Sequence, residues 1–118
     1  MRLLAWIQRL WDRYGPARRL QVVMGDELPS PMPSRDLVLT RDDGEPWSVG
    51  MLCPCGCGAT IEMLIVDGAQ PRWDIDVDTK GRPTLRPSVW RSTGCRSHFW
   101  VRSGRIVWCG EPMESPQR

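Results

Sequence analysis

The sequence predicts a small, mostly antiparallel β domain with an amphipathic helix at its N-terminus. Glycine and proline are both abundant, with 11 of each in 118 residues, which favours short strands joined by turns. Several segments alternate apolar and polar residues with a period of two, which is typical of half-buried strands. The length fits one domain, and a hydrophobic content of 41% argues against wholesale disorder.

We expect three regions along the chain. Residues 1–19 form an N-terminal helix and linker, residues 20–110 form the β domain, and residues 111–118 form a flexible tail. Within residues 1–13 apolar side chains recur at helical spacing, and Gly15-Pro16 ends the helix. The helix packs on its own domain or docks on a protein partner, because one short helix has only marginal affinity for a membrane surface.

Short strands are expected across the β domain. Residues 37–41 and 47–51 flank Asp42-Asp43-Gly44, which suits the loop of a hairpin. Residues 61–65 and 73–77 each place an apolar side chain at every second position. These segments therefore predict two-faced strands with one face directed to a core.

The last hairpin predicts specific neighbours. If Ser103-Gly104 is a two-residue turn, the register places Cys109 directly opposite His98, about 5 Å away at Cβ. The same register gives the hairpin one core-facing side, made of Phe99, Val101, Ile106 and Trp108.

Five cysteines and one histidine indicate a metal site. Three of the cysteines alternate through the run Cys-Pro-Cys-Gly-Cys-Gly at residues 53–58, and a Cys-x-x-His pair follows at residues 95–98. Clustered thiols in a chain without an export signal fit a metal better than disulfides. Zinc prefers four such ligands in a tetrahedron. We predict one zinc ion that pins the domain, bound by four of Cys53, Cys55, Cys57, Cys95 and His98, with Cys109 in reserve.

A thiolate-rich zinc site favours a structural role, because thiolates offset the charge that would activate a bound water. If cysteines alone bind the metal, His98 is free to act as a base for Ser88, Ser97 or a surplus thiol. The competing interpretation of Ser88 is a turn residue that bonds its own backbone.

A block without acidic residues, 79–110, contains seven basic residues and predicts a basic face. Together with Trp90 and Trp100 it raises a nucleic-acid alternative. The net charge of only +2 and the core position expected for Trp108 disfavour that alternative.

Three ordered motifs resemble a family of small bacterial proteins of unknown function. They are CPCGCG at residues 53–58, TLxPS at residues 84–88, and CRSHFW at residues 95–100, within a match over roughly residues 26–109. The recurrent positions are Cys53, Cys55, Cys57, Thr84, Ser88, Cys95, Ser97 and His98, and Cys109 is not among them.

Members of that family are often encoded beside ubiquitin-like proteins and their conjugation enzymes. The resemblance implies a cytoplasmic role in a prokaryotic ubiquitin-like modification pathway, as a peptidase that processes or deconjugates ubiquitin-like proteins. The candidate catalytic residues are then Ser88, Ser97 and His98, and the partners are a ubiquitin-like protein or its conjugation enzymes. The alternative is a non-catalytic, zinc-stabilised binding module for a protein or nucleic acid, and no transmembrane segment is expected in either case.

Overall fold

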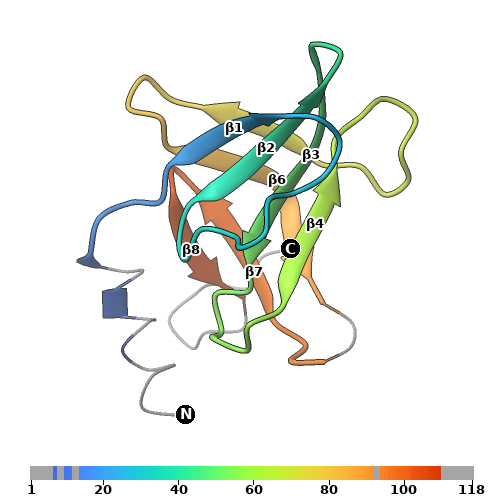
Figure 1. The fold of residues 1–118 in the computed structure, drawn as a ribbon. Helices are drawn as coiled ribbons and strands as arrows, with labels where there is room; N and C mark the ends of the chain where they lie inside the picture. Colours follow the sequence, from blue (N-terminus) through green and yellow to red (C-terminus); the bar gives the residue numbers. More distant parts are fainter. Residues whose placement is uncertain (1–6, 8–9, 12–13, 92–93, 110–118) are drawn as a thin grey trace.

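Two four-stranded sheets face each other in the computed structural model, which describes residues 7, 10–11, 14–91 and 94–109 (Figure 1). The first sheet contains, in spatial order, β1 (Leu20–Met24), β2 (Leu37–Asp42), β3 (Glu45–Leu52) and β4 (Thr60–Leu64). The second contains β5 (Asp74–Val77), β6 (Pro83–Trp90), β7 (His98–Arg102) and β8 (Arg105–Trp108). Strand β1 pairs with β2 in parallel, and the other pairs of described strands are antiparallel. The prediction of a mostly antiparallel β domain is confirmed.

The core lies between the two sheets. It draws on both, with fully buried side chains that include Leu37, Val49, Met51, Phe99 and Val101. Burying one such side chain contributes about 1.5–3 kcal/mol relative to leaving it in water. The two sheets are therefore held face to face mainly by this apolar layer.

The predicted hairpins are confirmed. Val101 pairs with Ile106 and Arg102 with Arg105 around the Ser103-Gly104 turn. Beyond the last pair, the Cys109 N–H donates to the His98 carbonyl at 2.9 Å, as the register required. The predicted core side is also confirmed, because Phe99, Val101 and Ile106 are buried and Trp108 packs against them.

Strands β1 and β6 were not predicted from the sequence, and the prolines of β6 explain its omission. Proline cannot donate to a sheet ladder, and β6 contains both Pro83 and Pro87. The strand tolerates Pro87 because its register against β7 shifts between Leu85 and Val89, a β-bulge that leaves the intervening residues out of the regular ladder. Ser88 therefore lies in strand β6, within this bulge, and not in a turn.

The predicted N-terminal helix is described only in part. Most of residues 1–13 lie outside the described residues, as does the predicted tail at 111–118. No helix can be given bounds there, but the described residues Ile7, Leu10, Trp11 and Tyr14 are all helical, and the Gly15 N–H donates to the Trp11 carbonyl at 2.7 Å. Three members of the expected apolar stripe, Ile7, Leu10 and Trp11, are 40–51% exposed, and the Arg35 guanidinium lies 5.9 Å from the centre of the Trp11 ring. No described helix is long and apolar enough to cross a membrane.

Candidate active site and metal centre

The first three cysteines lie in a tight turn that follows β3. The Cys53 N–H donates to the Ala59 carbonyl at 2.8 Å, and the Gly56 N–H donates to the Cys53 carbonyl at 3.2 Å. Gly56 and Gly58 have φ values of 94° and 87°, a conformation that glycine adopts without a steric penalty. The run of residues 53–58 therefore forms a tight loop that gathers its thiols, as its glycines predicted.

Cys95 completes a cluster of four sulfur atoms. The Sγ atoms of Cys53, Cys55, Cys57 and Cys95 all lie within 4.8 Å of one another. The Cys53 Sγ lies 3.5 Å from that of Cys55 and 3.5 Å from that of Cys95. The two segments that supply these residues, the β3–β4 loop and the approach to β7, lie at the same end of the molecule (Figure 1). All four cysteines are free thiols.

This cluster has the size and chemistry of a tetrahedral metal site. Zinc–sulfur bonds of about 2.3 Å in a tetrahedron separate the sulfur atoms by about 3.8 Å. The observed separations bracket that value, so four thiolates could bind one ion with small adjustments. Four sulfur ligands close the coordination sphere, and closed sites of this kind stabilise folds rather than activate water.

The thiols of the cluster differ in acidity. Burial, together with the neighbouring thiols of Cys57 and Cys53, raises the pKa of Cys55 to about 12. Burial also acts on Cys95, but hydrogen bonds from the Ser97 hydroxyl and backbone outweigh it and lower the pKa of Cys95 to about 6. Four thiols this close cannot all ionise without a cation, and a divalent metal supplies the charge that allows it.

Two residues outside the predicted ligand set support the cluster. The Arg91 Nη1 donates to the Cys95 Sγ at 3.2 Å and to the Cys57 Sγ at 3.5 Å. The Ser97 Oγ lies 3.1 Å from the Cys95 Sγ and 3.6 Å from the Cys53 Sγ. Arg91 thus brings a positive charge to the thiols, and Ser97 belongs to the sulfur cluster.

Ser88 and His98 form a second constellation beside the first. The Ser88 Oγ lies 2.9 Å from the His98 Nε2. With the ring proton on Nδ1, Nε2 accepts the hydrogen bond from the serine hydroxyl, which is the arrangement of a nucleophile and its general base. Both residues are half-buried, so the pair is reachable from solvent.

Strand geometry explains how this pair forms. Trp90 is the cross-strand partner of His98. Ser88 and Trp90 are two residues apart in β6, so their side chains share one face of the sheet. Trp90 stacks on the His98 ring, with centroids 4.9 Å apart and planes 13° apart. Trp73 donates its Nε1–H to the Ser88 carbonyl at 3.4 Å, which ties the Ser88 backbone to the segment before β5.

The structure thus divides the predicted site residues into two groups. Cys53, Cys55, Cys57 and Cys95 lie together with Ser97, while His98 lies with Ser88. Cys109 neighbours His98 through the backbone and is not one of the four clustered sulfurs.

Sequence reasoning considered Trp90 only for a nucleic-acid face, and it did not connect Trp90, Arg91 or Trp73 with the serine–histidine pair or the sulfur cluster. The signal that could have found Trp90 and Arg91 is the strand β6, whose last residue pairs with His98.

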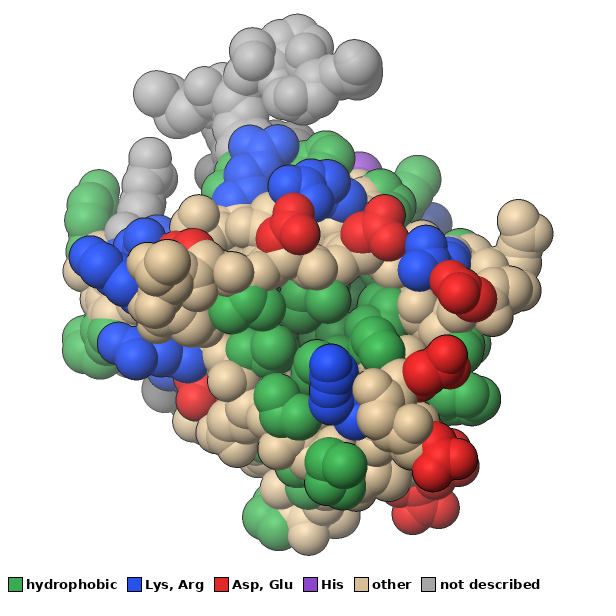
Figure 2. Space-filling view, turned by 90° about the horizontal axis from the view of Figure 1, so that it is seen from above, with side chains coloured by type: hydrophobic (Ala, Val, Ile, Leu, Met, Phe, Trp, Pro, Cys, Tyr) green, Lys and Arg blue, Asp and Glu red, His purple; other side chains and the backbone are tan. Residues whose placement is uncertain are grey.

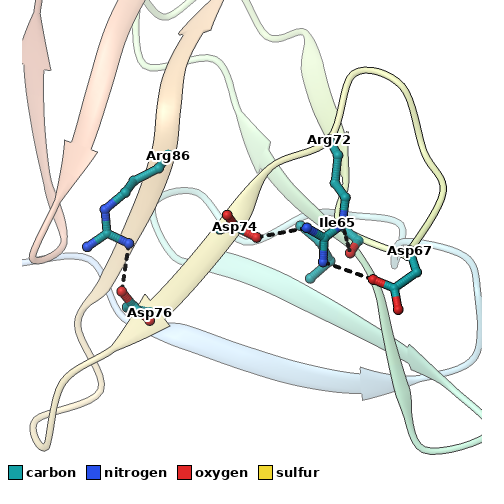
Figure 3. A network of polar contacts seen from close by, with 6 residues as sticks. All are labelled: Ile65, Asp67, Arg72, Asp74, Asp76 and Arg86. Carbon is teal, nitrogen blue, oxygen red and sulfur yellow. Dashed lines mark hydrogen bonds and ion pairs between the residues drawn. The ribbon is translucent and has the colours of Figure 1, made fainter.

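Two arginines of the predicted basic face are paired with aspartates. Arg86 pairs with Asp76 at 2.6 Å, and Arg82 pairs with Asp78 at 2.7 Å. Arg72 likewise bonds Asp67 and Asp74 (Figure 3). Seen from the end above β1 in Figure 1, acidic and basic side chains mix around a hollow of hydrophobic side chains (Figure 2). Asp76 in β5 and Asp78 just after it therefore offset two arginines of the acid-free block, because β5 lies directly beside β6.

One comparison with known proteins identifies a related family. A family model described as "Bacterial ubiquitination-like system serine protease (BubE)" matches residues 24–109. The matched segment contains both the sulfur cluster and the Ser88–His98 pair. Searches of curated proteins and of solved structures returned no match.

Proposed function

The chain belongs to the family of bacterial ubiquitination-like system serine proteases (BubE), whose model covers most of it, and we propose that it hydrolyses acyl bonds through Ser88. The observation that carries this proposal is the 2.9 Å contact between the Ser88 Oγ and the His98 Nε2. A serine hydroxyl is a weak nucleophile until an adjacent base removes its proton. In the described part of the chain His98 occupies that position, and it is the sole histidine of the sequence.

The proposed reaction follows from this geometry. The Ser88 Oγ attacks the carbonyl carbon of the scissile bond while its proton passes to the His98 Nε2. The imidazolium then gives that proton to the departing amine, which leaves Ser88 acylated. Water deprotonated by the same nitrogen attacks the acyl group and regenerates the serine. The family description makes a ubiquitin-like precursor or conjugate the proposed substrate.

The sulfur cluster supports this reaction without taking part in it. We propose that Cys53, Cys55, Cys57 and Cys95 bind one zinc ion, because four thiols of suitable spacing form a closed, thiolate-only donor set. Cys95 lies three residues before His98 in the chain. A bound ion would link the 53–58 loop to the segment that delivers the base. His98 is then left to Ser88, with cysteines alone as ligands.

The test is cleavage of a ubiquitin-like precursor, or of its conjugate, by the wild-type protein and by Ser88→Ala. The proposal requires cleavage by the wild type and none by the variant. Uncleaved substrate with the zinc-loaded wild type would contradict it and favour the alternative, a zinc-stabilised module that only binds proteins of this pathway. The neutralised arginines beside β5 give no support to a nucleic-acid partner.

A further inference from the structure

The indole of Trp90 lies against the catalytic candidate His98 although most of it is open to solvent. Trp90 is 69% exposed, the largest exposure of any tryptophan among the exposed hydrophobic residues of the described chain. Its ring is nevertheless stacked nearly parallel on the imidazole, 4.9 Å away. A large aromatic side chain on a surface costs solubility, so its position beside a reactive pair needs a reason.

A base in a serine–histidine pair must be held in orientation. In most such sites a third group, usually a carboxylate, bonds the second imidazole nitrogen and fixes the ring. Among the described residues, the only side-chain hydrogen bond of His98 is the one to Ser88. The acids in and just after strand β5 in the same sheet, Asp74, Asp76 and Asp78, are each bonded to an arginine.

From these contacts we infer that Trp90 is a positioning residue, which holds the His98 ring in the plane that directs Nε2 at Ser88. The inference rests on the proposed hydrolytic function. Cross-strand pairing fixes the Cα atoms of the two residues, so the indole covers one imidazole face. Rotation of the imidazole about its bond to Cβ would break the stack and carry Nε2 away from the serine. The stack replaces, in part, the orienting bond that a carboxylate provides elsewhere.

Two substitutions of Trp90 distinguish the effect of aromatic stacking on His98 from the effect of side-chain size. Trp90→Phe keeps an aromatic face over the imidazole, whereas Trp90→Leu keeps an apolar side chain without one. Trp11→Leu is the matched control, because it removes another exposed tryptophan, 51% exposed, from outside the family match. Zinc content and melting temperature, measured on all variants, show which of them fold as the wild type does.

The first readout is the proton spectrum of His98, which is unambiguous because the chain contains one histidine. A stacked indole shields the imidazole C–H protons. Their resonances should move downfield in Trp90→Leu, stay near the wild-type position in Trp90→Phe, and stay unchanged in Trp11→Leu. Unchanged His98 resonances in Trp90→Leu would overturn the inference whatever the protein hydrolyses.

The second readout is acylation by a small fluorophosphonate, with the saturating rate separated from the concentration for half-saturation. The saturating rate should fall roughly two- to tenfold in Trp90→Leu, the size expected for one aromatic pair, and recover in Trp90→Phe. An unchanged rate, or a change confined to half-saturation, would overturn the positioning role alone. A wild type that is labelled no more than Ser88→Ala would instead overturn the proposed function, and the positioning role with it.

Discussion

The Ser88 Oγ and the His98 Nε2 lie 2.9 Å apart on neighbouring strands, and the segment that supplies His98 begins at a cysteine of the sulfur cluster. Cys95 and His98 thus share one short stretch of chain but face different partners. Ser97, between them, is buried against the thiols. In the proposed function, a metal bound by the four cysteines would hold the His98 segment in place without occupying the imidazole ring.

Replacing each of the two candidate serines should show which one is the nucleophile and which one supports the sulfur cluster. Ser88→Ala should reduce hydrolysis by at least about 10³-fold, since it removes the attacking atom. Ser97→Ala should leave Ser88 able to be acylated but weaken metal retention, because its hydroxyl contacts the Cys95 and Cys53 sulfurs. Hydrolysis rates and zinc content on the same preparations check both effects. The reverse pattern would make Ser97 the nucleophile.

Elemental analysis of purified variants should show which side chains bind the metal. We expect one zinc per chain in the wild type, and loss of it in Cys55→Ser and Cys95→Ala. His98→Ala and Cys109→Ala should keep the ion, because neither side chain is in the four-sulfur group. Zinc lost on replacing His98, with the fold otherwise intact, would show that the imidazole is a ligand and not the base.

Alkylation of the metal-free protein should depend on pH differently at each thiol. The thiolate is the reactive form, so Cys95 should become reactive as the pH rises through about 6, while Cys55, with a pKa of about 12, should stay unreactive at neutral pH. Ser97→Ala should move the Cys95 midpoint upward, because the Ser97 hydrogen bonds lower that pKa.

The same depression of the Cys95 pKa has a consequence for stability. The pKa of Cys95 in the folded protein lies below its ordinary value of 9.0, so its contribution to stability is fully present above pH 9.0 and is lost as the pH falls through about 6. The alkylation prediction is checked by removing the metal with a chelator, treating the protein with iodoacetamide at several pH values, and mapping the modified peptides, which gives the reactivity of each thiol. Equal reactivity at all four thiols would contradict the described hydrogen bonds.

Two glycines with positive φ allow a controlled comparison of how much an alanine substitution lowers the free energy of unfolding. A Cβ on Gly104, at φ +77°, would lie 2.4 Å from the Arg18 carbonyl oxygen, whereas one on Gly68, at φ +89°, would meet nothing within 4 Å. Gly68→Ala should lower the free energy of unfolding by about 1 kcal/mol, the cost of the backbone conformation. Gly104→Ala should lower it by at least about 1 kcal/mol more, because a backbone atom must move. Urea denaturation of the two variants measures the difference, and equal losses would contradict the packing of residues 17–18 over the β7–β8 turn.

Much of the second sheet could be predicted because local rules decide it. The two-residue turn at Ser103-Gly104 fixes the register of β7 against β8. Counting residues outward from this turn predicted that Cys109 lies beside His98, as observed. The 53–58 run gathers its thiols through its own glycines, so the cluster was visible in the order of the residues.

The Ser88–His98 contact could not be predicted in this way. It depends on the bulge between Leu85 and Val89, which shifts the β6–β7 register and is encoded by no turn motif. The prolines of β6 made the segment look like a connection rather than a strand. The division of Cys95 and His98 between two sites also depends on this pairing, because spacing alone fits both in one metal site.

The most direct test of the account is the mass of the intact protein after reaction with a fluorophosphonate, followed by mapping of the modified peptide. We expect a single adduct on Ser88 that is absent from Ser88→Ala, is strongly slowed in His98→Ala, and forms with zinc still bound. An adduct on Ser97, or no adduct on a zinc-loaded and folded wild type, would contradict it.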